Sequence, residues 1–178
     1  MPPKISDELN ARLARIKLFL CDVDGILTDS SVFIGLDQEI KRFHIRDGLG
    51  LLILREQGTK VGWVSRRYST ATTRRAEELK IDFLEQVKGS KVTAVENLLA
   101  KTGFNWDEVC FMGDDVVDLG VLKRAGVAAT VADAIDEAKA ASHYVTQTIG
   151  GHGGVREVVE LILKAQNRWQ KVVAENAA

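Results

Sequence analysis

Two aspartates separated by one residue, Asp22 and Asp24, follow a short apolar run and precede Gly25. The apolar run is typical of a buried strand, and glycine allows the backbone to turn sharply where that strand stops. Such a turn brings both carboxylates to the carboxyl end of the strand, the edge at which open α/β sheets bind ligands. Because two carboxylates repel each other at short range, the spacing indicates a bound cation or a shared proton.

Three further segments carry polar residues beside a predicted strand or helix. Ser65 ends the apolar run 61–64, and Lys91 opens a helical pattern, where the helix N-terminus adds positive potential. Either residue taken alone is typical of a solvated side chain, so their meaning depends on their order along the chain. A third apolar run, 109–112, is followed by a glycine and an acidic cluster that contains Asp114, Asp115 and Asp118.

Strand and helix patterns alternate along the chain. We expect strands at Leu18–Val23 and near 61–64, 82–84, 108–112, 127–131 and 143–145, and helices near 6–15, 47–57, 69–80, 91–102, 116–125, 134–141 and 155–173. This alternation predicts a parallel sheet with right-handed crossovers, that is, a Rossmann-like three-layer α/β fold. A β-hairpin at about 31–46, with its turn at Gly35–Gln38, is inserted into it. We predict one domain over residues 1–178, with a C-terminal helix and tail at about 155–178.

Composition excludes several classes of protein. The 178 residues carry 24 lysines and arginines against 25 aspartates and glutamates. Without a basic excess to neutralise phosphates, we expect no nucleic-acid partner. Apolar stretches are no longer than a strand, and Met1–Lys4 do not lead into an apolar signal, so we expect neither a membrane span nor export. Cys21 and Cys110 fall in predicted core strands and are expected to be buried free thiols of a cytoplasmic protein.

The segment from Asp22 to Asp29 resembles motif one, D-x-D-G-x-[LV]-[TS]-D, of the haloacid dehalogenase-like phosphohydrolases. Ser65 and Lys91 fit motifs two and three in the expected order, and the G-D-D-x-x-D segment that begins at Gly113 fits motif four. Four matches in order make membership of this superfamily the interpretation that the sequence favours.

This resemblance implies a phosphatase that works through an aspartyl-phosphate intermediate. Asp22 would be the nucleophile and Asp24 the general acid and base. Mg²⁺ would offset the converging negative charge, held by the Asp22 side chain, the Asp24 carbonyl and the Asp114 side chain. The supporting residues would be Lys91 for charge compensation, Ser65 and Gly25 at the phosphate, and Asp115 and Asp118 for orienting the groups around the metal.

From about Lys17 to about Gln166, the chain is similar to the 3-deoxy-D-manno-octulosonate 8-phosphate (KDO 8-phosphate) phosphatase family. The similarity rests on the segments Phe43–Gly50 (F-x-[VI]-R-D-G-x-G), Gly113–Asp118, Val131–Ala134, Tyr144–Thr146 and Gly150–Glu157. It implies a 2-keto-3-deoxy sugar-acid phosphate as the substrate, in lipopolysaccharide precursor synthesis. Arg46 and Arg67 would then bind acidic groups of that substrate, because guanidinium pairs bidentately with carboxylate.

The chain leaves no room for the cap domain that most of these phosphohydrolases carry. About 40 residues separate Asp24 from Ser65, and about 25 separate Ser65 from Lys91. The expected hairpin, helices and strand account for all of them. The resemblance therefore implies a capless homotetramer, in which a neighbouring subunit's hairpin covers each active site and excludes water.

Two residues depart from the family pattern, and alternatives stay open. Arg66 stands where glycine usually follows the motif-two hydroxyl residue, and His152 replaces a common arginine. Arg66 adds bulk and charge at the phosphate site, so a phosphatase for a nine-carbon keto-acid 9-phosphate remains an alternative. A non-catalytic oligomerisation module and a phospho-acceptor receiver domain are two others. The intact Asp22, Asp24 and Lys91 argue against the non-catalytic module, and the D-x-D pair argues against the receiver domain.

Overall fold

The computed structural model describes residues 5–36 and 38–177. At its centre is a six-stranded parallel sheet in the order β5-β4-β1-β6-β7-β8. The strands are β1 (Leu18–Cys21), β4 (Lys60–Ser65), β5 (Phe83–Gln86), β6 (Val109–Met112), β7 (Val127–Thr130) and β8 (Tyr144–Val145). Central β1 pairs with β4 on one side and with β6 on the other, so that Phe19 lies opposite Val61 and Cys110.

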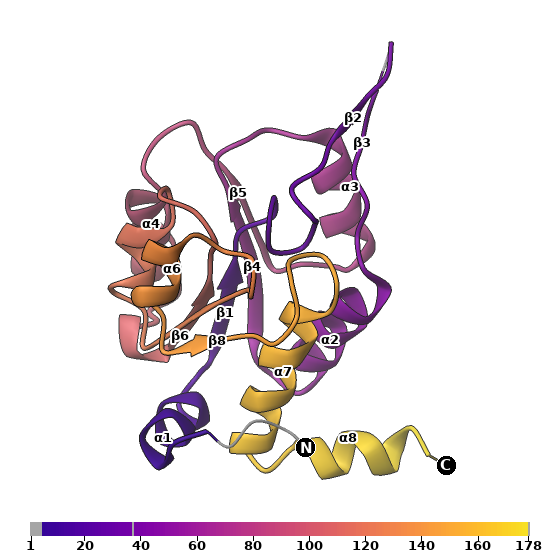
Figure 1. Ribbon diagram of the computed structural model, residues 1–178. Coiled ribbons are helices and arrows are strands. Elements are labelled where there is room, and N and C mark those ends of the chain that lie inside the picture. Colours follow the sequence, from indigo (N-terminus) through magenta and orange to yellow (C-terminus); the bar gives the residue numbers. More distant parts are fainter. Residues whose placement is uncertain (1–4, 37, 178) are drawn as a thin grey trace.

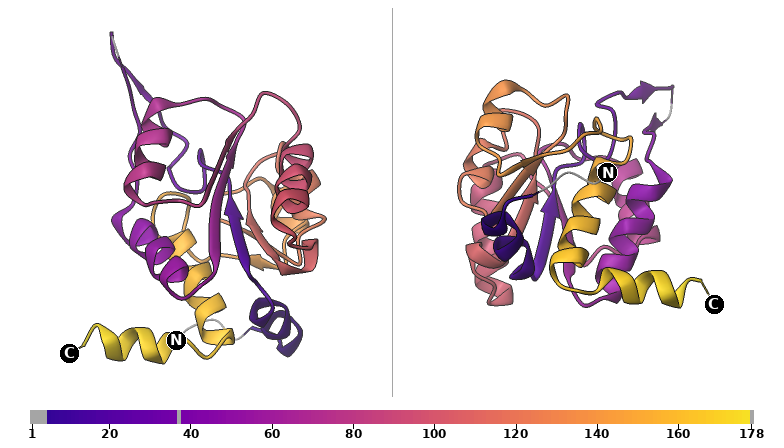
Figure 2. Two further views of the ribbon diagram at one scale, coloured as in Figure 1. Left: turned by 180° about the vertical axis from the view of Figure 1, so that it is seen from behind. Right: turned by 60° about the horizontal axis from the view of Figure 1, so that its bottom comes forward.

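Helices cover both faces of this sheet (Figures 1 and 2). One layer contains α2 (Ile45–Glu56), α3 (Thr70–Glu78) and α7 (Gly154–Ala165), and the other contains α4 (Lys91–Thr102), α5 (Leu119–Leu122) and α6 (Asp136–Ala140). A first helix, α1 (Asp7–Ala14), packs against α7, and a 3-10 turn, η1 (Trp106–Glu108), precedes β6. The predicted three-layer fold is confirmed, and residues 5–36 and 38–177 include no cap domain. Within the same ranges, no helix has the length and apolarity needed to cross a membrane.

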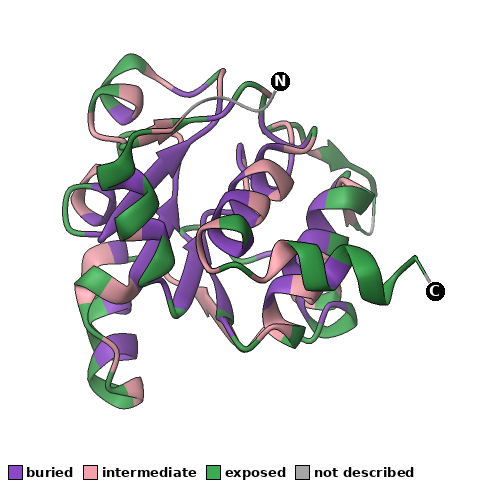
Figure 3. Ribbon diagram, turned by 90° about the horizontal axis from the view of Figure 1, so that it is seen from below, coloured by how far each residue is buried: buried purple, intermediate pink, exposed green. Residues whose placement is uncertain are grey.

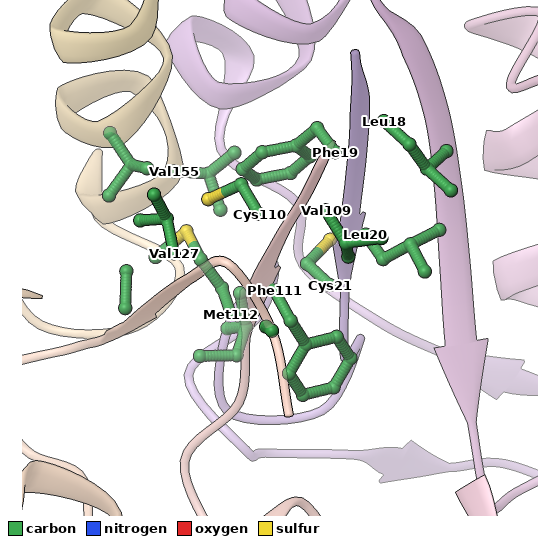
Figure 4. Close-up of a cluster of buried hydrophobic side chains, with 14 of the residues drawn as sticks. Leu18, Phe19, Leu20, Cys21, Val109, Cys110, Phe111, Met112, Val127 and Val155 are labelled. Atoms are coloured by element: carbon green, nitrogen blue, oxygen red, sulfur yellow. The ribbon is translucent and has the colours of Figure 1, made fainter. Parts of the chain in front are cut away.

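The core lies where the apolar runs of the sequence predicted it. Strands β1, β6 and β7 are buried along their whole length, whereas exposed residues lie mainly on the outer surfaces of the helices, in loops and on the hairpin (Figure 3). Cys21 and Cys110 are free thiols among these apolar side chains (Figure 4). Burial raises the pKa of both thiols. They therefore act as small apolar side chains, as the sequence predicted.

The hairpin is shorter than the sequence suggested. It pairs only between β2 (Phe33–Ile34) and β3 (Glu39–Ile40), and the Gly35 N–H donates to the Gln38 carbonyl across its turn. The predicted turn also contains Asp37, which lies outside the described residues, as do residues 1–4. In Figure 1 the hairpin projects beyond the carboxyl ends of the central strands, beside α3.

The single helix predicted at 155–173 is wrong, because two helices occupy this segment. They are α7 and α8 (Trp169–Glu175), and Asn167 between them has a φ of 57°, a left-handed conformation that asparagine tolerates and that ends a helix. The break lets the Trp169 ring stack against the Arg156 guanidinium, at 5.2 Å from the ring centroid. Helix α8 lies at the opposite end of the molecule from the hairpin (Figure 1).

Candidate active site

The carboxyl ends of two neighbouring strands bring three aspartates together. Asp22 follows β1 directly, whereas Asp114 and Asp118 follow β6. The Asp22 N–H donates to the Met112 carbonyl at 2.9 Å, which fixes the two strand ends side by side. Each aspartate offers one carboxylate oxygen to a cluster in which all oxygens lie within 4.8 Å of one another. Sheet topology therefore unites acidic segments that are far apart in the sequence.

Gly25 allows the second acidic segment to approach motif one. Its φ of +99° lies in the left-handed region, and a Cβ atom at this position would stand 2.0 Å from Asp114 Oδ2. Gly150 approaches the same turn from the other side, since a Cβ atom there would stand 1.9 Å from the Gly25 carbonyl oxygen. The Asp133 carboxylate holds Gly150 by accepting from its N–H at 2.9 Å. The glycine-rich segment therefore supports the turn that shapes the acidic cluster.

Burial makes two carboxylates of the cluster difficult to ionise. It raises the pKa of Asp22 to about 6, although nearby Lys91 acts in the opposite direction. Burial, followed by the charges of Asp22 and Asp118, raises the pKa of Asp114 to about 8. The buried Asp114 Oδ1 also finds no hydrogen-bond donor among the described residues. A hard divalent cation would satisfy this oxygen and offset the repulsion, so the residues fit Mg²⁺.

Lys91 occupies the first turn of α4, buried between two of these aspartates. Its Nζ lies 2.9 Å from Asp22 Oδ1 and 2.7 Å from Asp118 Oδ1. Burial acts to lower the pKa of Lys91, but the two carboxylates outweigh it and raise that pKa. Asp118 Oδ2 accepts from the backbone N–H groups of Asp114 and Asp115. Because both oxygens of Asp118 already have short contacts, the geometry supports an orienting role for it rather than direct metal binding.

Asp24 faces a second buried lysine, Lys41, which lies outside the sequence motifs. The Lys41 Nζ lies 2.6 Å from Asp24 Oδ1, 3.2 Å from Thr72 Oγ1 and 3.9 Å from Glu39 Oε1. Glu39 in turn forms an ion pair with Arg67. One signal for this site was present in the sequence: alternation along the hairpin strand puts the charges of Glu39 and Lys41 on one face.

Two predicted substrate-binding residues lie at the same sheet edge as Asp24. Ser65 ends β4 and is buried, and its Oγ lies 3.2 Å from both the backbone nitrogen and the carbonyl oxygen of Arg67. The Arg67 Nε lies 3.9 Å from Asp24 Oδ2. The structure therefore brings Ser65 and Arg67 to the sheet edge that carries Asp22 and Asp24.

Three other residues that the sequence analysis singled out are exposed. Arg46 is exposed on the first turn of α2, beside a cavity of about 310 Å³ that His152 also lines. Arg66 is exposed and its guanidinium donates to the Lys88 carbonyl at 3.4 Å. Asp115 is exposed and its carboxylate accepts from the next backbone N–H, at 2.6 Å. Binding roles for Arg46 and Asp115 stay predictions.

The R-D-G segment at Arg46–Gly48 has a structural explanation. The buried Asp47 carboxylate accepts from the backbone N–H groups of Gly153 and Arg156, at 3.1 and 2.7 Å, and so caps the N-terminus of α7. Gly48 makes room for a neighbouring side chain, because a Cβ atom there would stand 2.5 Å from Arg75 Nη2. The segment thus joins α2 to the glycine-rich loop that supports the motif-one turn.

Comparison with known proteins agrees with this geometry. Residues 57–159 match the family model of the haloacid dehalogenase-like hydrolases. The chain is 36% identical to the 3-deoxy-D-manno-octulosonate 8-phosphate phosphatase KdsC of Yersinia pestis, over 93% of this chain and 89% of that protein. The chain belongs to the KDO 8-phosphate phosphatase family of haloacid dehalogenase-like hydrolases.

Solved structures of KDO 8-phosphate phosphatases share the fold over almost the whole chain. The Moraxella catarrhalis enzyme, in complex with magnesium, phosphate and KDO, superimposes with a TM-score of 0.92 at 38% identity and covers 95% of this chain and 98% of its own. The cobalt-bound Haemophilus influenzae enzyme superimposes with a TM-score of 0.85 at 37% identity, and the match covers 89% of this chain and 93% of that enzyme's chain. Both relatives bind a divalent metal, the kind of ion that the aspartates described above fit.

Proposed function

We propose that this protein is a Mg²⁺-dependent phosphoric monoester hydrolase that converts KDO 8-phosphate to KDO and phosphate, in lipopolysaccharide precursor synthesis. The observation that carries the proposal is the pair of lysine-bound carboxylates at one sheet edge, with Asp22 against Lys91 and Asp24 against Lys41. The Moraxella catarrhalis relative, bound to magnesium, phosphate and KDO, supports the choice of substrate. One domain would perform this reaction in the cytoplasm, where the buried thiols stay reduced.

Asp22 would act as the nucleophile. Lys91 and the backbone N–H of Val23 both contact its Oδ1, at 2.9 and 2.7 Å. This leaves Oδ2 to form the bond to phosphorus, while the bond between phosphorus and the sugar oxygen breaks. The Asp22 and Asp114 side chains and the Asp24 carbonyl would hold Mg²⁺, which offsets the charge of the phosphate and the carboxylates when bound.

Asp24 would serve both halves of the reaction. It would first give a proton to the departing sugar oxygen, and then accept a proton from the water that hydrolyses the aspartyl-phosphate. Arg67 faces Asp24, and Ser65 contacts the Arg67 backbone at the same sheet edge, where the two residues would bind phosphoryl oxygens and an acidic group of the sugar. Lys91 would hold the nucleophile and offset charge as it develops on the phosphoryl group.

A homotetramer completes the proposal. The hairpin exposes apolar side chains on both strands and in the turn, including Phe33, Ile34, Leu36 and Ile40. Several large apolar side chains exposed on one short hairpin favour burial against another protein surface. A neighbouring subunit's hairpin would cover the open active site and exclude water from it. Analytical ultracentrifugation of wild type and of Ile34→Asp tests this arrangement, with a shift from tetramer to monomer expected for the variant.

Phosphate release from a panel of sugar-acid phosphates, with Mg²⁺ and with EDTA, tests the activity. Rapid Mg²⁺-dependent release from KDO 8-phosphate by wild type, and its loss in Asp22→Asn, are expected. Asp107→Asn is the matched control, because Asp107 is an exposed aspartate in η1, at the end of the sheet away from the cluster. Preference for a nine-carbon keto-acid 9-phosphate would change the substrate and keep the mechanism. Absence of turnover with every ester, by a folded wild-type protein, would contradict the proposal.

A further inference from the structure

The Lys41 side chain is fully removed from solvent, although it carries an ammonium group. Burying such a group is unfavourable unless oxygen partners replace its water. Three partners do so, and they come from three different elements: Asp24 after β1, Thr72 on α3 and Glu39 on β3. The ammonium therefore links the motif-one turn, a scaffold helix and the hairpin at a single point.

The contact with Asp24 is selective for one oxygen of the carboxylate. Lys41 Nζ lies 2.6 Å from Oδ1, as an ion pair rather than as an aligned hydrogen bond. The other oxygen, Oδ2, faces Arg67 Nε at the longer distance of 3.9 Å. An ammonium group only donates hydrogen bonds, and its positive charge disfavours a proton on the carboxylate oxygen that it contacts. A proton carried by Asp24 is therefore directed to Oδ2.

We propose that Lys41 is a positioning residue, which holds the Asp24 carboxylate so that Oδ2 carries and transfers the catalytic proton. The inference rests on the proposed function of Asp24 as general acid and base. In the first half-reaction the proton leaves Oδ2 for the sugar oxygen as the bond from that oxygen to phosphorus breaks. In the second half-reaction water attacks phosphorus, the Asp22–phosphorus bond breaks, and a proton from the water returns to Oδ2.

Leaving-group dependence separates this role from a merely structural one. A sugar alkoxide leaves poorly and needs the proton, whereas p-nitrophenolate leaves without it. The experiment measures single-turnover release of the alcohol from KDO 8-phosphate and from p-nitrophenyl phosphate. It compares wild type, Lys41→Met and Lys41→Arg, with Lys60→Met as the control. Lys60 is a lysine in an ion pair with Asp82, at 2.8 Å, and it begins β4 at the end of the sheet away from the site.

In Lys41→Met, we expect sugar release to slow by about 100-fold and p-nitrophenolate release to change by less than about fivefold. Hydrolysis of the aspartyl-phosphate should slow for both esters, which leaves a burst of p-nitrophenolate followed by slow turnover. Lys41→Arg should recover part of the sugar rate, and Lys60→Met should match wild type. Thr72→Val, which keeps the lysine and removes one of its partners, should show a smaller loss with the same selectivity.

Equal slowing of both release steps in Lys41→Met, or no slowing of either, would overturn the positioning role. Thermal unfolding of each variant identifies a protein that does not fold, and in that case Thr72→Val and Lys41→Arg decide the question. A wild-type protein that hydrolyses neither ester would refute the proposed function itself, so the two failures are distinguishable.

Discussion

Lowering the pH should weaken Mg²⁺ binding much more than ordinary carboxylate ligands would allow. The structure raises the pKa of Asp114 to about 8 and that of Asp22 to about 6 in the metal-free protein. A carboxylate must lose its proton before it binds a metal ion. Below each pKa, the apparent affinity for Mg²⁺ should therefore fall about tenfold per pH unit for every proton displaced.

The size of the effect follows from these two values. At pH 8 half of the Asp114 side chains carry a proton, which weakens apparent binding about twofold. At pH 6 the factor from Asp114 is about 100, and half-protonated Asp22 adds about twofold more. Apparent Kd should thus rise about 100-fold between pH 8 and pH 6, which is about 2.7 kcal/mol. Carboxylates with ordinary pKa values would change it by only a few per cent over the same range.

Isothermal titration calorimetry with Mg²⁺ at pH 6, 7 and 8 measures this dependence. Repeating each titration in two buffers of different ionisation enthalpy gives the number of protons released, expected to be about one at pH 7. Asp107→Asn should keep the full pH dependence, because Asp107 is an exposed aspartate in η1, at the end of the sheet away from the cluster. A change in Kd of less than about threefold between pH 8 and 6, or binding without proton release, would refute the reasoning.

The same pKa values fix the sign of a stability effect in the metal-free protein. A raised carboxylate pKa means that the folded state binds more protons than the unfolded state between the ordinary value, about 4, and the raised value. Stability in EDTA should therefore fall as the pH rises from 6 to 8, through the pKa of Asp114. Saturating Mg²⁺ should remove that fall, because it favours the ionised folded state.

Three further predictions concern other parts of the molecule. Gly25→Ala should abolish Mg²⁺ binding in calorimetry, because its Cβ would stand 2.0 Å from Asp114 Oδ2 and its φ is +99°. His143 Nδ1 accepts from the Ala128 N–H at 2.9 Å, and burial lowers the pKa of this histidine. The free energy of unfolding should therefore decrease as the pH falls below about 6.5. In His143→Asn, whose amide oxygen can accept the same bond, urea unfolding at several pH values should show a smaller decrease. Trp169→Ala should lower the free energy of unfolding by about 1–2 kcal/mol, because it removes the cation–π contacts of this ring. Phosphatase activity should not change, since α8 lies far from the sheet edge that carries the site. A loss of activity would contradict that separation.

The sheet and its acidic edge were predictable because their signals are local in the sequence. Each core strand is a short apolar run, and polar residues follow these runs at Asp22, at Ser65 and, after one glycine, at Asp114. Once strands and helices alternate, the handedness of the crossovers leaves few topologies, and all of them place strand ends together at one edge. Sequence reasoning therefore reached the cluster without any knowledge of distances.

Features that depend on contacts distant in sequence were not predictable in the same way. The pairing of Lys41 with Asp24 requires the hairpin to fold back over the motif-one turn, and no local pattern specifies that arrangement. The break at Asn167 is accompanied by a distant contact, because the Trp169 ring stacks on Arg156, in the first turn of the preceding helix α7. Neither contact could be predicted from the local pattern of residues in the sequence.

The two lysines tie the two proposed catalytic aspartates to different parts of the structure. Lys91 belongs to α4, so the proposed nucleophile Asp22 is fixed to the helical layer that packs on the sheet. Lys41 belongs to the hairpin, so Asp24 is fixed to an insertion whose apolar surface is exposed. In the proposed tetramer, that surface would be buried by a neighbouring subunit, and burial would steady the strand that carries Lys41. Formation of the aspartyl-phosphate would then depend mainly on the scaffold, whereas proton transfer would depend on assembly. Dissociating the tetramer should accordingly impair release of a sugar alkoxide more than release of p-nitrophenolate, the same selectivity expected for loss of Lys41.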